Sequence, residues 1–590
     1  MKSFPNKLFL DNIKLVLILA VASILRLYNL SDIPYGFHFD EAQAAYNGFL
    51  ISEHLKNVNG EFLPLDIDYF GDFRPALHSY LIVPFIKILG NTIVAARLPA
   101  AIFGVYSVLI TYLLTLKIFK SKSISHIAAS FLAVSPFHII FSRASSDAII
   151  EMSFVLTSIY FLYCYIENKN IIKLPIIYLL WVASFFTYQI SRMMIPIITM
   201  VFLITQSFGG IKLIIKSRTI IILIPLIIFI IFPLFYFLTT NKTAGRFSQV
   251  STFSFPEVQR ALNEQVTEAG TIGLNPVFVR IFHNKIVAYS SDILKRHLSF
   301  YSPQILLFDD ARPIRYQISN IGFITPFEYL FALVGIYFFV RKKIKQLIFV
   351  TLVIIIAPLP SAITFEDFPN FHRAIYLIPY VQILAALGLY MIFMNIKFHK
   401  AFTFIGVGIF AWYSCFFILQ YFILSPLHEP FHRNYENKEI SKYLDQNKNI
   451  YDRVGLTGET GIYISYLYFN ELDVLEIPIN KEGKYFNGEY NIENVYFTKY
   501  RCVDTISTIY NRFDLVINLN ECEPSRIFIK DKDFRLSDGS LAASAYIIDK
   551  AKSEQYKKRN IDLFNCLESR GFKSKTECLR LYPESRQDAI

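Results

Sequence analysis

Residues 220–238 read IIILIPLIIFIIFPLFYFL and residues 374–394 read AIYLIPYVQILAALGLYMIFM, without one charged side chain in either stretch. A helix needs roughly 20 predominantly apolar residues to cross the hydrocarbon core of a bilayer. Both stretches are long enough, and similar apolar runs recur between residues 13 and 423. We therefore expect a polytopic α-helical membrane protein.

The composition agrees with this expectation. Hydrophobic residues make up 54% of the 590 residues and charged residues 18%, whereas soluble proteins carry about 25% charged residues. The formal net charge of +11 would also suit a nucleic-acid-binding protein. Many of the Lys and Arg residues, however, lie in short loops between apolar runs, as membrane topology requires. We therefore expect the protein to contact the lipid bilayer and not to bind nucleic acid.

Eleven spans are predicted, although adjoining runs such as 174–208 can be divided differently: residues 13–30, 97–119, 124–141, 148–166, 174–190, 193–208, 219–238, 322–340, 346–363, 374–394 and 401–424. Every second loop is basic: Lys117, Lys120 and Lys122; Lys169 and Lys173; Lys212, Lys216 and Arg218; Arg341, Lys342, Lys343 and Lys345; Lys397 and Lys400. Cytoplasmic loops carry this positive bias. Loops 31–96 and 239–321 and the C-terminal part therefore share the extracytoplasmic face of the cell membrane.

The domain organisation follows from the same pattern. Residues 1–424 form the predicted transmembrane domain, in which the apolar segment 77–89 is expected to lie in the membrane interface. Residues 425–590 form a predicted external α/β domain, with a helix at 439–446 and strand-like runs at 453–456, 494–498 and 514–517. An external domain can oxidise its cysteines, and Cys502–Cys522 and Cys566–Cys578 would be the pairs.

Charged residues at the ends of the spans are the candidate site. In the first external loop Asp40 and Glu41 are adjacent carboxylates, and Arg74 precedes the segment 77–89. An Asp at a helix start can also be an N-cap worth about 1 kcal/mol, and an Arg at this depth can be a headgroup anchor. These alternatives stay open.

Two further clusters follow spans on the same predicted face. Arg143, Asp147 and Glu151 have i, i+4 and i+8 spacing, which would place them on one face of a helix as a supporting acidic and basic site or as a salt bridge at the helix end. His372 and Arg373 precede the tenth span, where an Arg suits a phosphate because its planar fork makes bidentate contacts. Ionisable groups gathered at one membrane face are a functional-site hypothesis by default.

The order of several motifs resembles a known family. The chain has P-x-G-x-x-x-DEA from residue 34, RPALHSYLIVP from 74, ARLPAAIFGVYSVLITY from 96, SPFHIIFSRASSDAIIE from 135 and FPNFHRAIYLIPYVQILAALGL from 368. This series is similar to polyprenyl-phosphate-dependent glycosyltransferases of the GT-C class, which include protein O-mannosyltransferases and aminoarabinose transferases of lipid A. The resemblance covers roughly residues 1–424.

The resemblance implies a reaction and site roles. The donor would be a polyprenyl-phosphate sugar (mannose or another hexose or pentose), and the acceptor a hydroxyl of a protein, lipid or cell-envelope glycan. Asp40 matches the acidic residue at the glycosyl-transfer centre, with Glu41 beside it, while Arg74 matches a basic residue before a proline. Arg74, His372 and Arg373 would bind the donor phosphate.

Two alternatives to this reading remain. Some relatives use a divalent metal, and the only weak sequence signal for one is Asp66-Ile-Asp68, a three-residue D-x-D match. A membrane transporter or flippase is the alternative function. The sequence lacks the paired Gly- or Pro-broken spans that indicate alternating access, which favours the glycosyltransferase.

Overall fold

The computed structural model describes residues 4–69, 72–206, 222, 224–229, 231, 250–308, 313–342, 347–395, 399–428, 430–457, 461–476, 480–482, 489–498, 500–522, 525–571 and 575–582. Most of the predicted span 219–238 lies outside these residues. The basic loop residues Lys212, Lys216, Arg218, Lys343, Lys345 and Lys397 also lie outside them.

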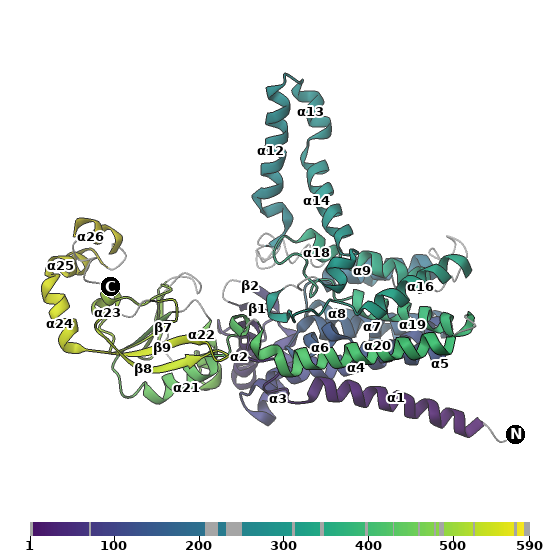
Figure 1. Ribbon diagram of the computed structural model, residues 1–590, viewed down its shortest axis with the longest axis horizontal. Coiled ribbons are helices and arrows are strands. Elements are labelled where there is room, and N and C mark those ends of the chain that lie inside the picture. Colours follow the sequence, from purple (N-terminus) through teal and green to yellow (C-terminus); the bar gives the residue numbers. More distant parts are fainter. Residues whose placement is uncertain are drawn as a thin grey trace.

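Long apolar helices form one body of the molecule, and a mixed sheet with its own helices forms the other (Figure 1). The helices that make up the first body are α1 (Phe4–Leu27), α4 (Ile93–Phe119), α5 (Lys122–Val134), α6 (Pro136–Arg143), α7 (Asp147–Asn168), α8 (Lys173–Phe185), α9 (Ser191–Gln206), α16 (Pro326–Lys342), α17 (Leu347–Ile356), α18 (Leu359–Ile363), α19 (Leu377–Asn395) and α20 (His399–Ile418), which continues as the π-helical η4 (Leu419–Leu424). The predicted fold class, a polytopic helical membrane protein with a C-terminal α/β domain, is confirmed.

Fewer helices pass a strict test for spans than the eleven predicted. Within the described residues, four segments are long and apolar enough to cross a membrane: Ile93–Phe119, Asp147–Asn168, Leu377–Asn395 and Phe404–Leu427. The predicted single span at 124–141 is a bent pair, α5 and α6, with a 56° change of direction. The break lies at Pro136, which has no N–H to continue the hydrogen-bonding of α5.

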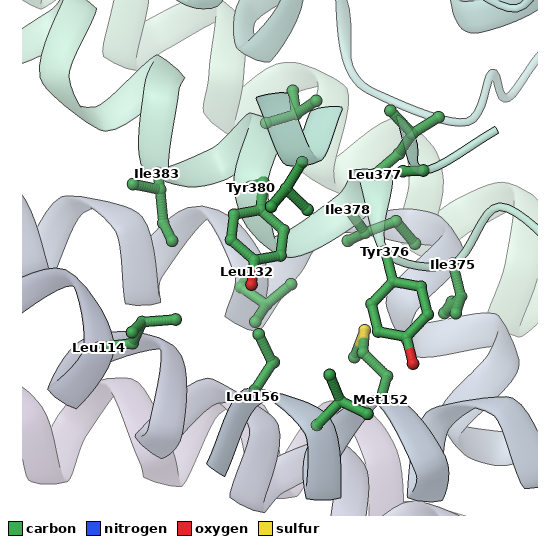
Figure 2. Close-up of a cluster of buried hydrophobic side chains, with 14 of the residues drawn as sticks. Leu114, Leu132, Met152, Leu156, Ile375, Tyr376, Leu377, Ile378, Tyr380 and Ile383 are labelled. Atoms are coloured by element: carbon green, nitrogen blue, oxygen red, sulfur yellow. The ribbon is translucent and has the colours of Figure 1, made fainter. Parts of the chain in front are cut away.

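Helix α19 lies at the centre of the membrane domain. Its side chains Tyr380 and Ile383 pack toward Leu114 of α4, Leu132 of α5 and Leu156 of α7 (Figure 2). On its other side α19 approaches α16 so closely that a Cβ on Gly388 would lie 1.9 Å from the Phe331 carbonyl oxygen. Small residues permit such close packing between membrane helices.

Loop 31–96 is folded and packs against the C-terminal domain. It contains α2 (Phe39–His54), the antiparallel strands β1 (Asp66–Tyr69) and β2 (Asp72–Pro75), and α3 (Leu77–Leu89). The predicted helix at 77–89 is therefore confirmed. The hydroxyl of Tyr46 on α2 donates to the Leu472 carbonyl oxygen at 2.8 Å and fixes α2 to the C-terminal domain.

The described part of loop 239–321 forms a long helical hairpin that projects from the membrane domain (Figure 1). It comprises the 3₁₀ turn η2 (Thr252–Ser254), α12 (Pro256–Thr271), α13 (Pro276–Phe282) and α14 (Lys285–Ser299). The chain then returns through α15 (Pro303–Leu307) and the turn η3 (Ile314–Tyr316). Proline begins α12, α13 and α15, because the first helical position needs no N–H donor.

The C-terminal domain has a seven-stranded sheet in the order β4-β5-β6-β3-β7-β9-β8. Strand β3 is parallel to β6 and β7, and the other pairs are antiparallel. The strands are β3 (Val454–Thr457), β4 (Asn480–Glu482), β5 (Glu489–Ile492), β6 (Val495–Thr498), β7 (Leu515–Leu519), β8 (Phe528–Arg535) and β9 (Leu541–Ile548). The helices are η5 (Ser425–Leu427), η6 (Pro430–Arg433), α21 (Asn437–Asn447), α22 (Ile462–Phe469), α23 (Thr505–Asn511), α24 (Lys550–Arg559), α25 (Ile561–Arg570) and α26 (Lys575–Leu581). The helix and the three strands expected from sequence are present.

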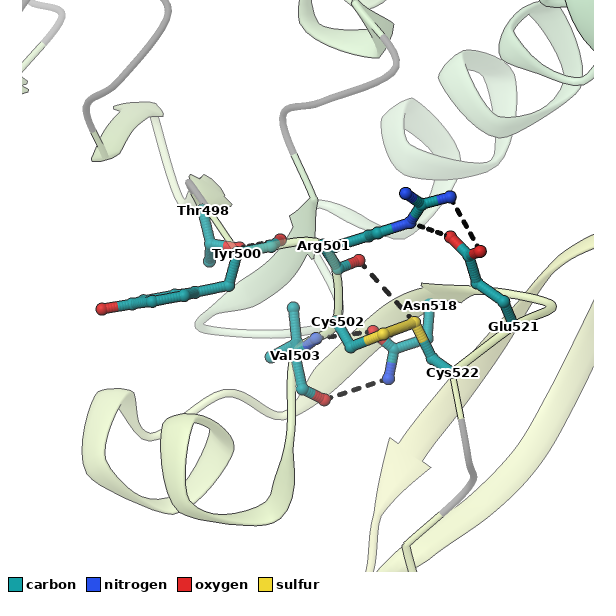
Figure 3. Close-up of a disulfide and its surroundings, with 8 residues drawn as sticks. All are labelled: Thr498, Tyr500, Arg501, Cys502, Val503, Asn518, Glu521 and Cys522. Atoms are coloured by element: carbon teal, nitrogen blue, oxygen red, sulfur yellow. Dashed lines mark hydrogen bonds and ion pairs between the residues drawn. A yellow bond between two sulfur atoms is a disulfide. The ribbon is translucent and has the colours of Figure 1, made fainter. Parts of the chain in front are cut away.

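Both expected disulfides join segments of this domain. Cys502 pairs with Cys522, next to an ion pair between Arg501 and Glu521 (Figure 3). Cys566 of α25 pairs with Cys578 of α26. Cys164 and Cys415, which lie in apolar helices, are free.

Candidate functional site

One polar cavity of about 300 Å³ is lined by side chains from several separate segments. Its walls come from the start of α2 and β2, the start of α7, the turn η3, and the segment 366–373 before α19. Six of the eight residues proposed from sequence line it: Asp40, Glu41, Arg74, Asp147, His372 and Arg373. Arg143 and Glu151 do not line it. The clusters predicted to share one face of the membrane domain therefore meet in one place.

Asp40 lies at the second position of α2 and is not its N-cap. His38 is the N-cap: its Nδ1 accepts from the Asp40 N–H at 3.0 Å, and the Glu41 carboxylate accepts from the His38 N–H at 3.4 Å. The capping alternative for Asp40 is therefore wrong. Its carboxylate instead forms ion pairs with Arg74 at 3.1 Å and Arg315 at 2.8 Å.

The two guanidinium groups decide the charge of Asp40. Burial alone raises the pKa of its carboxyl group, but the positive charges of Arg74 and Arg315 outweigh that effect and bring the pKa below its ordinary value. Asp40 is therefore ionised at neutral pH. As long as both arginines hold it, it is a weak proton acceptor, because a good general base has a pKa near the working pH.

His372 connects the segment before α19 to the start of α7. Its Nε2 lies 2.7 Å from Ser146 Oγ and 3.5 Å from the Asp147 carboxylate, and its Nδ1 lies 3.1 Å from the Tyr188 hydroxyl. The ring stacks on Tyr316 at 5.6 Å between centroids. Burial, and then the charge of Arg315, hold the pKa of His372 well below its usual value, so it is neutral at pH 7. A neutral imidazole donates one hydrogen bond and accepts another, but it cannot attract a phosphate by charge.

Arg373 reaches the cavity from the same segment. Its guanidinium contacts the Glu366 carboxylate and the Glu366 carbonyl oxygen, both at 2.9 Å. Arg74, Arg315 and Arg373 thus bring three positive charges to one cavity. Such a set suits a ligand that carries several negative charges, such as a phosphate.

Glu41 has a different role from its neighbour Asp40. Its side chain is 4% exposed and is held between Arg97 at 2.7 Å and Arg433 at 2.5 Å. Arg97 also donates to the Leu30 and Pro34 carbonyl oxygens. Glu41 therefore joins loop 31–96, α4 and the start of the C-terminal domain, and both of its oxygens are already bound to guanidinium groups.

The predicted single helix through Arg143, Asp147 and Glu151 is wrong. Arg143 is the last residue of α6 and Asp147 the first of α7, because the chain turns between them at Ser145, which has a positive φ of 48°. The buried Arg143 guanidinium donates to the Leu25, Tyr28, Asn29 and Ile33 carbonyl oxygens. It therefore secures the end of α1 and the turn that follows.

Glu151 is likewise separate from the cavity. It is fully buried in α7 and accepts a hydrogen bond from the Tyr376 hydroxyl. Of the three residues only Asp147 faces the cavity. The break at 144–146 separates Arg143 from α7, so the i, i+4 spacing holds only between Asp147 and Glu151.

Two arginines that bind the carboxylates of Asp40 and Glu41 were not predicted from the sequence. Arg315 lies in η3 within the long loop 239–321, and Arg433 follows the last span by some residues. In the sequence, Arg315 follows Asp310 by five residues, and Arg433 lies between Glu429 and Glu436. The signal for Arg315 was its place in the charged stretch DDARPIR at residues 309–315.

The cavity carboxylates do not form a cation site as they stand. Both oxygens of Asp40 face guanidinium groups, and Asp66 of the D-x-D match pairs with Arg192 at 3.3 Å. Within the described part of the chain, one group has metal-ligand spacing: His54, Asp473 and Glu476, whose ligand atoms lie within 4.8 Å of one another. None of these three lines the cavity.

Comparison with known families agrees with the motifs. Residues 74–237 match the model of the dolichyl-phosphate-mannose-protein mannosyltransferases. The resemblance to GT-C glycosyltransferases is confirmed. The match begins at Arg74 and includes Asp147, but it covers less than half of the chain and not Asp40, Arg315 or Arg373. Among curated protein sequences none matches.

Several solved structures are remotely similar. The oligosaccharyltransferase AglB from Archaeoglobus fulgidus, in complex with an inhibitory peptide and a dolichol-phosphate, has 12% identity and a TM-score of 0.44 over 79% of this chain. The chain spans 64% of that protein's length. ArnT from Cupriavidus metallidurans bound to undecaprenyl phosphate has 11% identity and a TM-score of 0.39, covering 79% of this chain and 76% of ArnT. These likenesses are too remote to assign a residue or a substrate.

Proposed function

We propose that this chain is a membrane glycosyltransferase that moves a sugar from a polyprenyl-phosphate carrier to a hydroxyl acceptor on the outer face of the cell membrane. The observation that carries the proposal is the convergence of Arg74, Arg315 and Arg373 around the ionised Asp40 in one cavity. The family match over residues 74–237 supports the same chemistry.

Phosphate binding is assigned to the three arginines. A lipid-linked phosphate reaches headgroup depth while its isoprenoid tail stays in the bilayer. Arg74 and Arg315 hold Asp40 when no donor is bound, and a phosphate with more negative charge would compete for them. Arginine suits this exchange because its planar fork binds phosphate and carboxylate in the same bidentate way. The sequence also predicted phosphate binding for His372. Because its ring is neutral, we assign His372 to hydrogen bonding instead.

Asp40 is assigned as the general base. In the transfer step the acceptor oxygen attacks C1 of the sugar, the bond from C1 to the phosphate oxygen breaks, and the acceptor proton passes to Asp40. Donor binding draws Arg74 and Arg315 toward the phosphate and so raises the basicity of the carboxylate. The arginines then stabilise the extra charge on the departing polyprenyl phosphate.

The acceptor side of the cavity is assigned to Asp147 and His372. Their polar atoms lie within 3.5 Å of each other, so they can orient one hydroxyl group between them. A structural role, holding neighbouring segments together, is assigned to Glu41, Arg143 and Glu151. Their side chains bind neighbouring protein groups. The sugar and the acceptor class stay open among those implied by the resemblance.

Mass analysis of cell-envelope glycans tests the proposal in cells. We expect a glycan, glycoprotein or glycolipid that is present with the wild-type gene and absent with an Asp40→Asn allele. A flippase would change the amount of lipid-linked sugar on each face without needing a base. Unchanged envelope glycans in cells without the gene would contradict the glycosyltransferase assignment.

A further inference from the structure

The helical hairpin α12–α14 exposes an unusual number of large apolar side chains. On α13 and the adjoining part of α14, Val277, Phe278, Ile281, Phe282 and Ile286 are between 59% and 80% exposed. Leu294 and Leu298 continue the series along α14 at 56% and 58%. Soluble surfaces rarely leave an apolar patch of this extent uncovered.

The two long sides of the hairpin differ in character. The described exposed side chains of α12 are mostly polar, including Glu257, Arg260, Glu264, Thr267 and Glu268. Its apolar Leu262 is buried in the hairpin. The exposed apolar side chains are therefore concentrated on α13 and α14, which makes the whole hairpin amphipathic.

The charges follow the same division. Helix α12 has three acidic residues and one basic residue, whereas α13 and α14 together have four basic residues and one acidic residue. The basic residues beside the apolar patch include Arg280, Lys285 and Lys295. Apolar side chains with flanking Lys and Arg characterise helices that lie in the interface of a membrane with anionic lipids.

The hairpin lies where such an interface would be. It extends across the direction of the long membrane helices α1, α4 and α20, near the end of the bundle that adjoins the C-terminal domain (Figure 1). Helix α12 is on the side of the C-terminal domain, while α13 and α14 are on the side toward which the membrane helices run (Figure 1). A bilayer around α1, α4 and α20 would therefore lie on the side of α13 and α14, whereas α12 is on the side of the C-terminal domain.

Contacts at its base fix this orientation. Arg296 of α14 donates to the Thr364 carbonyl oxygen at 3.2 Å and packs over the Phe365 ring at 4.7 Å. Ser251 forms a β-bridge with Thr364. The hairpin is therefore attached to the segment that leads to Arg373.

We propose that the hairpin α12–α14 is a membrane-surface anchor, with the exposed apolar side chains of α13 and α14 inserted among the lipids of the leaflet next to the C-terminal domain. Interfacial helices bury their apolar face about 5–10 Å into the boundary of headgroups and acyl chains. The basic residues of α13 and α14 then lie among the phosphates, and α12 stays hydrated.

Spin labels on the full-length protein in nanodiscs with anionic lipid test this. The free cysteines are first replaced, as Cys164→Ala and Cys415→Ala. Labels are placed on the apolar side at Phe278→Cys or Leu294→Cys, with Glu264→Cys on α12 as the matched control. Molecular oxygen concentrates in lipid and a nickel chelate stays in water, so collisions with each report the depth of a label.

We expect the ratio of oxygen to nickel collisions at positions 278 and 294 to exceed that at position 264 several-fold. Equal ratios at all three positions would overturn the proposal, since the apolar side would then face water. Protection of positions 278 and 294 from both reagents would also overturn it, because a second protein surface would then cover the patch.

Discussion

Asp40 and Glu41 are neighbours with different environments. The sequence presents two equivalent carboxylates, and both were predicted to be catalytic. In the structure Glu41 is buried between Arg97 and Arg433, while Asp40 is held by arginines that line the cavity. Consecutive helix positions point about 100° apart, so the two carboxylates bind different arginines although both residues line the cavity. Only the folded chain shows which carboxylate is buried and which is held in the cavity, because their arginine partners come from distant segments.

Replacement of Asp40 by Asn is expected to abolish transfer and keep the protein folded. The amide cannot accept the acceptor proton, and loss of a general base lowers the rate roughly 10²-fold or more. Thermal unfolding in detergent and turnover of a lipid-linked sugar measure the two effects separately. A folded Asp40→Asn protein with near-normal turnover would remove Asp40 from the role of base.

Replacement of Glu41 by Gln should act on stability first. Removal of the charge leaves Arg97 and Arg433 partly uncompensated in a buried site, and breaking a buried pair costs about 3–5 kcal/mol. We expect a clear fall in the unfolding temperature of the purified protein. Glu167→Gln is the control, since Glu167 pairs with Lys117 and Lys120 in a more exposed place and should change stability little. Equal stability of both variants would contradict the assigned role of Glu41.

At the scale of elements, helices and strands with a continuous apolar or alternating pattern could be predicted from the sequence. The positions where a helix is interrupted could not. The apolar run 77–89 gave helix α3 with the same bounds, and alternating runs gave β3, β6 and β7. Pro136 and the turn at Ser145 interrupt the region read as one span and one charged helix face. The hairpin α12–α14 falls within the predicted loop 239–321, because its apolar residues are spread over two short helices and form no continuous run.

The cavity arginines come from β2, η3 and the segment before α19, and each should matter for donor use. Arg74→Ala or Arg315→Ala is expected to lower turnover of a polyprenyl-phosphate sugar by about 2–4 kcal/mol of transition-state stabilisation. Arg74→Lys should restore part of it, since a point charge lacks the bidentate fork. Arg501→Ala is the control, because Arg501 pairs with Glu521 in the C-terminal domain. An Arg74→Ala protein as active as the Arg501→Ala control would exclude phosphate binding by Arg74.

For the whole molecule, the membrane orientation is a prediction that rests on the basic loops alone. The cavity, loop 31–96 and the C-terminal domain pack together, so they share one side. Cysteine introduced at Ser540 should be labelled from outside intact cells by an impermeant reagent, whereas cysteine at Lys169 should need permeabilised cells. Labelling in the reverse pattern would place the cavity in the cytoplasm and contradict a donor taken up on the outer face.

The central claim is that the donor is a lipid-linked sugar, and one measurement tests it most directly. Purified protein in nanodiscs is given a defined polyprenyl-phosphate sugar or the matching nucleotide sugar, and release of each carrier is followed with a panel of hydroxyl acceptors. The account predicts release of polyprenyl phosphate by the wild-type protein, none by Asp40→Asn, and no use of the nucleotide sugar. Activity with the nucleotide sugar and none with any lipid-linked donor would contradict it.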